Sequence, residues 1–147
     1  MFEDFPQFVP QNICLSCQGC CRFIDEKSDW RPREPEGRVK TKKIRDVFYC
    51  QFLEEKSNEC SKYIKRPLQC VFYPFLIEKK NNQIALSVHL ACPYIQEHRH
   101  AKDFDMHQEK LKGFLSKNNF AAFLKDNEYL IEDYSSYPDE IETLFFL

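Results

Sequence analysis

The sequence predicts a small α+β domain that is stapled by metal, with a β-hairpin, cysteine-bearing loops and C-terminal helices. The chain has 147 residues, the usual size of a single domain. All eight cysteines lie within residues 14–92, whereas later residues show helical spacing of apolar side chains and no obvious chemistry. We therefore predict one domain over 1–147, with a metal-binding part at about 14–94 and a helical part at about 103–147.

The first third of the chain is expected to be mostly irregular. Residues 1–13 combine phenylalanines and prolines without a regular period, which predicts an arm lying across apolar surface. Residues 29–46 contain prolines, a glycine and many basic side chains, and they are predicted to form a loop. Aromatic and β-branched residues at 47–53, followed by polar residues at 54–58, predict a strand and a tight return before Cys60.

A short helix and a hairpin are predicted next. Pro67 suits the first turn of a helix, where its missing N–H costs nothing, and this helix would carry Cys70. The run at 79–82 is a good turn, and apolar residues alternate with small or polar ones over 84–90. This pattern predicts a hairpin whose second strand has one buried face and delivers Cys92.

The C-terminal part is predicted to be helical. Apolar residues recur near helical spacing over 104–115, and Asp103 before them is a reasonable N-cap. A short helix is expected at 120–124. Pro138 is expected to open a last helix through 141–146.

Charge and hydropathy limit the classes of binding partner and the cellular compartment that we expect for this protein. The net charge of -2 gives no general attraction to nucleic acid or to an anionic membrane. No stretch approaches the ~18 apolar residues of a membrane span, and the N-terminus lacks the features of a signal peptide. We therefore expect a cytoplasmic protein. Thiol buffers in the cytoplasm keep ordinary cysteine pairs reduced. Metal ligation therefore explains the eight cysteines better than disulfide bonds do, and disulfides are the weaker alternative.

The spacing of the cysteines is typical of metal ligands. A C-x2-C unit lets two thiolates reach one ion while backbone N–H groups stabilise the sulfurs, and residues 14–21 contain two overlapping units of this kind. Adjacent side chains point in different directions, so Cys20 and Cys21 are expected to serve different centres, or one to serve and one to support. Burial as a packed thiol remains an alternative for Cys50 and Cys92. The candidate ligands are Cys14, Cys17, Cys20, Cys21, Cys50, Cys60, Cys70 and Cys92.

The sequence favours iron–sulfur over zinc without deciding between them. Zinc domains often combine two C-x2-C knuckles, whereas the four later cysteines are each isolated. The pair Cys92-Pro93 is locally similar to the ligand run of bacterial ferredoxins. An iron–sulfur cluster such as a 4Fe-4S cluster is therefore preferred, and zinc stays open because thiolate-rich sites accept both. Eight thiols suffice for two sites of four, or for one site with spare thiols.

The histidines and the basic stretch are better explained by structure than by chemistry. A sufficient set of thiols exists without the imidazoles, so we expect ordinary structural roles for the histidines. The basic stretch at 31–45 also contains prolines and acidic residues, which favours a solvated loop over a nucleic-acid contact. The histidines are His89, His98, His100 and His107.

Several motifs together resemble one family. Residues 14–22 read C-x2-C-x-G-C-C-R, and Cys50 is followed by Gln-Phe-Leu. Residues 60–70 read C-x2-Y-x2-R-P-x2-C, and Tyr-Pro-Phe follows at 73–75. These motifs are similar to the YkgJ-type cysteine-cluster family (CxxCxxCC), whose members are described as candidate zinc- or iron-chelating proteins. The resemblance covers about 14–94. It implies a chelating role for the first seven cysteines and fits Cys92 more loosely.

The arginines in these motifs are suited to stabilise the negative charge of the thiolates. Arg66 can offset the negative charge of nearby thiolates, Arg22 could do the same, and Tyr63 is expected to pack over the site. We expect a metal-binding protein with an accessory or redox role and without catalytic residues. Its partners are a metal ion or cluster and, in some settings, another protein. The alternative is an enzyme of methyltransferase or oxidoreductase type, because flagellin lysine N-methylases share a similar cysteine pattern in a longer protein.

Overall fold

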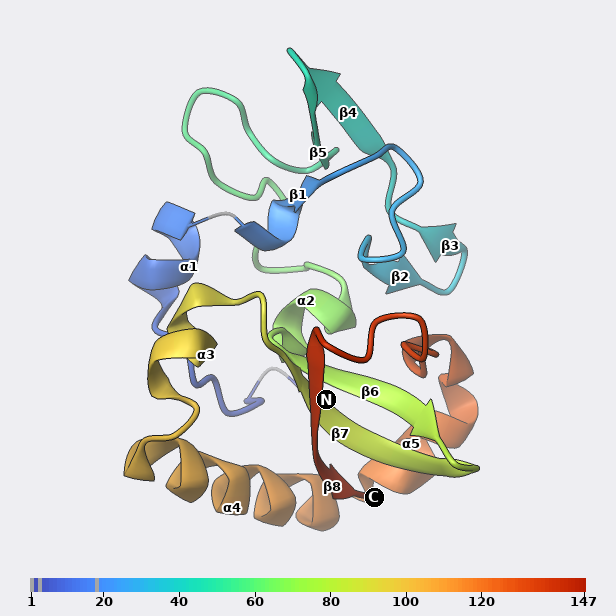
Figure 1. Cartoon of the computed structure of the whole chain (residues 1–147). Helices are drawn as coiled ribbons and strands as arrows, with labels where there is room; N and C mark the ends of the chain where they lie inside the picture. The colour runs from blue at the N-terminus through green and yellow to red at the C-terminus, as the bar shows by residue number, and fades with distance from the viewer. Residues whose placement is uncertain (1, 3, 18) are drawn as a thin grey trace.

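The structure is a computed structural model that describes residues 2, 4–17 and 19–147. It combines helices with antiparallel sheets, which confirms the α+β class. Figure 1 shows two lobes, an N-terminal lobe of residues 11–66 and a C-terminal lobe of residues 67–147. In the part that the structure describes, no helix is both long and apolar enough to cross a membrane.

A three-stranded sheet forms the centre of the C-terminal lobe. Its strands are β6 (Phe75–Lys80), β7 (Gln83–His89) and β8 (Ile141–Phe146), all antiparallel in the order β6-β7-β8. The predicted hairpin is confirmed. Asn81 and Asn82 form its turn with φ of 53° and 61°, a left-handed conformation that asparagine tolerates well.

The prediction of one buried face on the second strand of this hairpin is wrong. Ala85 and Ser87, on the face predicted to be exposed, are both fully buried. The reason is that β7 is the central strand and its second face is covered as well. Trp30 from the N-terminal lobe stacks on His89 of this face, and Ser87 donates a hydrogen bond to the Glu78 carboxylate of β6.

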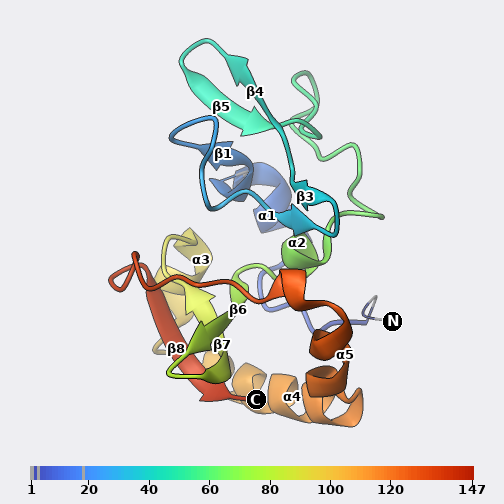
Figure 2. The same cartoon turned by 90° about the vertical axis from the view of Figure 1, so that its right-hand side faces the viewer.

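Helices cover the side of this sheet away from the N-terminal lobe (Figure 2). The amphipathic helix is confirmed as α4 (Lys102–Lys117), and α5 (Phe120–Asp126) and the 3-10 turn η2 (Glu128–Leu130) follow it. The N-cap of α4 is Ala101 and not Asp103, whose carboxylate accepts a hydrogen bond from the next backbone N–H within the first turn. The buried face of α4 consists of Phe104, His107, Leu111 and Leu115.

The predicted last helix is wrong, because residues 141–146 form strand β8. The central strand β7 offers an open edge, and pairing places Phe145 opposite Leu86 and Phe146 opposite Ala85. Aromatic and β-branched residues suit a paired strand better than a short isolated helix. Pro138 lies in the turn before this strand.

The N-terminal arm packs as predicted in its described residues. Phe2, Phe5 and Val9 are buried in the main core. Phe2 lies edge-on to Phe72 and Phe120, at centroid distances of 6.0 and 5.2 Å. The arm therefore fastens the start of the chain to the C-terminal lobe, just before the first cysteine.

The N-terminal lobe contains short elements. After α1 (Gln11–Cys17) and the 3-10 turn η1 (Gly19–Cys21), the strands are ordered β1-β5-β4 in one sheet, and β2 and β3 pair as a separate hairpin. The predicted strand before Cys60 is confirmed in its first half. Its continuation is a single bridge between Leu53 and Cys60. The strands are β1 (Arg22–Phe23), β2 (Arg33–Glu34), β3 (Gly37–Arg38), β4 (Thr41–Ile44) and β5 (Val47–Cys50).

The predicted loop over 29–46 is therefore only partly correct, because three of these strands lie in it. Gly37, with φ of 137°, permits the sharp turn between β2 and β3. Arg45 adopts φ of 57° in the turn that pairs β4 with β5. These backbone conformations close hairpins that have no clear alternating pattern in the sequence.

A buried carboxylate joins the two lobes. Glu132, only 5% exposed, accepts hydrogen bonds from Arg33 (3.0 Å) and Arg38 (2.8 Å), which lie on β2 and β3. Its backbone pairs with β6, so the β2–β3 hairpin is tied to the sheet of the other lobe. A buried charge with two partners is costly to leave unpaired.

We predict that Glu132→Gln lowers the free energy of unfolding by about 1–3 kcal/mol, because two arginines then lose their anionic partner. Denaturant unfolding of the full chain measures this. The matched control is Glu128→Gln, an exposed carboxylate nearby, for which we expect a change within about 0.5 kcal/mol. Equal effects of the two substitutions would contradict the role given to Glu132.

Candidate metal centre

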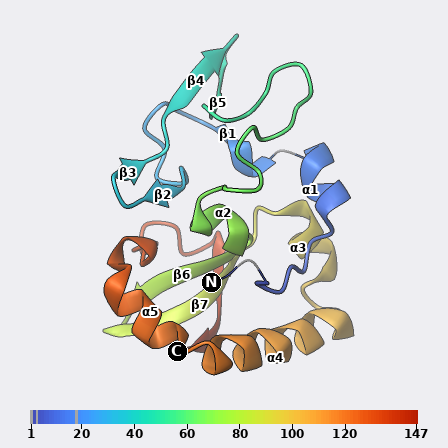
Figure 3. The same ribbon diagram turned by 180° about the vertical axis from the view of Figure 1, so that it is seen from behind.

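The eight cysteines gather around the seam between the two lobes, and all are free thiols. Helix α2 (Leu68–Phe72) lies in this seam in each view, as Figure 3 shows from behind. The hydrophobic arm and α1 bring the first cysteines to it, β5 brings Cys50, and α2 brings Cys70. Cys92 is the N-cap residue of α3 (Pro93–His98).

The first group of thiols surrounds Cys14. Burial raises the pKa of the Cys14 thiol to about 11, and the neighbouring Cys20, Cys92 and Cys17 add to the rise by charge repulsion. Burial also raises the pKa of Cys92, where backbone N–H groups of α3 oppose the effect and Cys17 and Cys20 strengthen it. Cys14, Cys17, Cys20 and Cys92 therefore lie within electrostatic reach of one another.

The second group consists of Cys50, Cys60 and Cys70. Burial raises the pKa of Cys70 well above the ordinary value, and Cys20, Cys50 and Cys60 add to this by repulsion. Burial likewise raises the pKa of Cys50, which is close enough to Cys60 and Cys20 to be affected by both. The residues of this group come from three separate segments of the chain.

Cys20 and Cys21 connect the two groups. A hydrogen bond with Cys21 is the largest cause that raises the pKa of Cys20, and burial is the next. Part of Cys20 is exposed to solvent, yet enough protein surrounds its thiol for burial to matter. Cys21 packs against the small core of the N-terminal lobe, which includes Cys50. The two adjacent cysteines thus differ in surroundings, with Cys21 on the side of the second group.

The thiols gather without forming a closed ligand set. Among residues 2, 4–17 and 19–147, no three His, Cys, Asp or Glu side chains come close enough together to hold an ion. The raised pKa values of Cys14, Cys20 and Cys70 keep these thiols neutral near pH 7. A soft metal cation would reverse this by favouring the thiolates, and binding would release protons.

The ligand type, thiolate sulfur, and the room around the Cys17 sulfur both suit zinc or iron. Thiolate sulfur is the preferred ligand of iron–sulfur irons and a common ligand of Zn²⁺. At Gly19, a Cβ atom would lie 3.3 Å from the Cys17 sulfur, so any larger residue would crowd that atom. Glycine therefore leaves the sulfur accessible between two candidate ligands.

Arg66 lies where its charge reaches both groups. Its guanidinium lowers the pKa of Cys14, Cys20 and Cys70, against the larger effects that raise those values. It donates a hydrogen bond to the Tyr63 carbonyl (2.8 Å) and lies 4.1 Å from the centre of the Tyr63 ring. Tyr63 thus holds the arginine in place. Arg22 lies over the Tyr49 ring, at 5.8 Å.

Sequence reasoning missed the roles of Tyr73 and His89. The Tyr73 hydroxyl and His89 Nδ1 are 2.9 Å apart and share a hydrogen bond. Burial raises the pKa of Tyr73, and four thiols of the first group contribute to the rise, which shows that the phenol lies near them. Burial lowers the pKa of His89 to about 4, so it is neutral at pH 7. The sequence signals for Tyr73 were its place in the Tyr-Pro-Phe motif at 73–75 and its spacing of three residues from Cys70.

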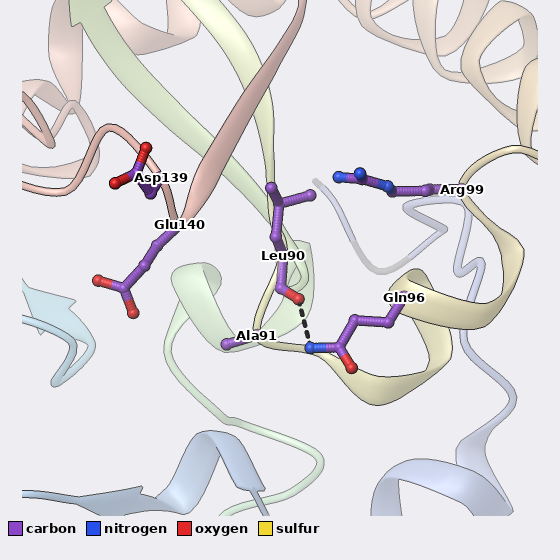
Figure 4. Close-up of a pocket in the computed structure, with 6 residues that line it drawn as sticks. All are labelled: Leu90, Ala91, Gln96, Arg99, Asp139 and Glu140. Carbon is purple, nitrogen blue, oxygen red and sulfur yellow. Dashed lines mark hydrogen bonds between the residues drawn. The ribbon is translucent and has the colours of Figure 1, made fainter.

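A shallow pocket of about 450 Å³ lies beside β7 and α3, close to Cys92 in the sequence. Figure 4 shows that the Glu140 carboxylate points away from Arg99. Gln96 donates a hydrogen bond to the Leu90 carbonyl. The polar groups therefore do not converge on one point where a ligand atom could be held. Its lining residues are Leu90, Ala91, Gln96, Arg99, Asp139 and Glu140.

The chain is similar to a known family of cysteine-rich domains. A family model, described as "CxxCxxCC: Putative zinc- or iron-chelating domain", matches residues 13–144. The chain belongs to this family. The match confirms the resemblance and extends from α1 into β8, so the CxxCxxCC domain includes the sheet and the helices as well as the cysteines. No curated protein and no solved structure matches the chain.

We predict that the metal-free protein alkylates slowly at Cys14. The thiolate is the reactive form, and a pKa of about 11 in place of 9.0 delays its formation as the pH rises. Labelling with iodoacetamide at a series of pH values, read by peptide mass spectrometry, measures this. The control is Cys14 in the denatured chain. A folded profile that coincides with the denatured one would contradict the raised pKa.

The same shift predicts the pH dependence of stability in the metal-free protein. Folding favours the neutral thiol, because the pKa is higher in the folded state. The stabilisation is complete below the unfolded pKa of 9.0 and is lost as the pH rises from there towards about 11. Denaturant unfolding at increasing pH should therefore show falling stability across this range.

Proposed function

We propose that this protein binds metal at the seam through its eight cysteines, as two adjacent centres of four thiolates each. Cys14, Cys17, Cys20 and Cys92 form the first centre. Cys21, Cys50, Cys60 and Cys70 form the second. The proposal is carried by the mutual effect of the thiols on their pKa values. Cys17 raises the values of Cys14 and Cys92, Cys60 raises those of Cys50 and Cys70, and Cys20 raises all four.

The division assigns the adjacent cysteines to different centres. It is supported by the packing of Cys21 beside Cys50 and by the repulsion of Cys14 by Cys20. The effect of Cys20 on Cys50 and Cys70 means that the centres are close neighbours. Closing each ligand set requires small movements of side chains, so metal binding is coupled to the final ordering of the lobe.

Iron–sulfur clusters are our preferred occupants and zinc is the alternative. The later ligands come one at a time from β5, a bridge residue, α2 and the N-cap of α3, and not from a second C-x2-C knuckle. A cluster of this kind gives the protein an accessory or redox role in a reducing compartment such as the cytoplasm. The methyltransferase or oxidoreductase alternative stays a prediction without a supporting contact among the described residues.

Anaerobic purification followed by metal and sulfide analysis tests this function. We expect two centres per chain, with the visible absorption of thiolate-bound iron. Cys14→Ser should remove the first centre and Cys60→Ser the second, and each should leave the other. The control is Ser16→Ala, an exposed residue of α1 between two ligands. Protein that carries no metal would overturn the proposal, whereas colourless protein with zinc would overturn only the iron–sulfur preference.

We predict that Arg66→Gln weakens metal retention by about tenfold, the lower end of what partners around a metal site contribute. Its positive charge lowers the pKa of Cys14 and Cys70, which burial raises, and the pKa of Cys20, which the hydrogen bond with Cys21 and burial raise. Competition with a chelator of known affinity measures the effect. Lys65→Gln, which removes an exposed charge from the neighbouring position, is the control. Equal retention in the two variants would contradict the role of Arg66.

A further inference from the structure

A chain of aromatic rings leads away from the thiols. Trp30 is the only tryptophan of the protein. It stacks on His89 with a centroid distance of 4.1 Å and an interplanar angle of 11°. Its ring also stacks on Tyr134 at 5.1 Å and contacts Tyr137 at 5.0 Å. Tyr73 lies edge-on to His89 at 5.6 Å, so the five rings are in continuous contact.

The tyrosine at each end of this chain is hydrogen-bonded to a group that can accept a proton. Tyr73 shares its hydrogen bond with His89 Nδ1. Tyr137 donates its hydroxyl proton to the Asp29 carboxylate at 2.8 Å. A phenol that loses an electron becomes a very strong acid, so its oxidation needs a base in contact with the hydroxyl. Both end residues meet this requirement.

The two ends also differ in their surroundings. Tyr73 is part of the seam, because it packs against the same hydrophobic cluster as Cys14 and that cluster includes Cys92. Tyr137 is half-buried in a surface segment, and its partner Asp29 is exposed. The chain of rings therefore runs from the thiol-rich seam to solvent.

We propose that these rings form a relay that carries single oxidising equivalents from the thiols to the surface. The oxidant that enters is a cysteine thiyl radical, produced when a radical oxidant removes a hydrogen atom from a neutral thiol. The reductant at the surface is a small hydrogen-atom donor of the thiol or ene-diol class. The relay would protect the thiols, because a thiyl radical left in place is open to irreversible oxidation.

Each step transfers one electron. First, Tyr73 gives an electron to the thiyl sulfur, which becomes a thiolate, and its phenolic proton moves to His89 Nδ1. Second, Trp30 gives an electron to the Tyr73 radical, and the proton returns from His89 to the phenol. Third, Tyr137 reduces the Trp30 radical cation, and its proton moves to Asp29.

The last step takes place at the surface. The external donor supplies a hydrogen atom to the Tyr137 radical, and Asp29 releases its proton to water. Every residue of the relay is then restored, and the net reaction is the reduction of one thiyl radical by one external donor.

Pulse radiolysis with azide radicals tests the relay on the full chain as purified. Azide radicals oxidise tryptophan preferentially, so the oxidising equivalent is placed on Trp30 alone. We expect the visible absorption of the tryptophan radical to decay as that of a tyrosyl radical rises. The rate should be independent of protein concentration and slower in deuterated water.

Variants locate the tyrosine that receives the equivalent. Tyr137→Phe and Asp29→Asn should each slow the transfer by about tenfold or more, the scale expected when a positioned proton acceptor is lost. Asp29→Asn keeps every ring in place, so it separates proton acceptance from packing. The control is Tyr129→Phe, whose ring packs against the main core outside the stack. Transfer that depends on protein concentration, or that is unchanged in both Tyr137→Phe and Asp29→Asn, would overturn the relay.

The result is independent of the metal proposal. A chain that retains metal but shows no transfer within the molecule overturns the relay alone. A chain that shows the transfer but never carries metal leaves the relay in place and overturns the proposed metal centres.

Discussion

The N-terminal lobe has too small a core to stabilise itself, and this constraint explains much of the structure. Its hydrophobic cluster contains three buried residues, Phe23, Val39 and Cys50. Burial of such side chains contributes about 1.5–3 kcal/mol each, whereas ordering the backbone costs about 1–2 kcal/mol for every residue. The lobe therefore depends on the seam with the larger lobe, where Glu132 pairs with two arginines and Trp30 stacks on His89.

The thiols lie at this same seam, so the chemistry and the stability of the protein are coupled. Without metal, burial favours neutral thiols and the ligand sets stay open. A metal that favours thiolates would add cross-links between segments that have few apolar contacts. In this view the proposed centres supply the stability that a larger core supplies in other domains of this size, and Arg66 reduces the cost of the negative charge.

Sequence patterns predicted correctly those elements whose conformation depends on residues nearby in the chain. The hairpin turn at Asn81 and the amphipathic helix over 102–117 are both present. Predictions from the sequence were wrong where contacts with residues far away in the chain determine the conformation. Residues 141–146 became a strand because β7 offers an open edge, and the second face of β7 is buried because Trp30 from the other lobe stacks on it.

The number and spacing of the thiols are properties of the chain, so the expectation of metal binding and the resemblance to the CxxCxxCC family could be read without a structure. The folded chain was needed to bring Tyr73, His89 and Trp30 into contact and to give Cys20 and Cys21 different surroundings. These relations join residues far apart in the chain, as in the contact of Arg33 with Glu132, 99 positions away. Spacing along a chain constrains nearby residues only, so the relations across the seam could not be read from it.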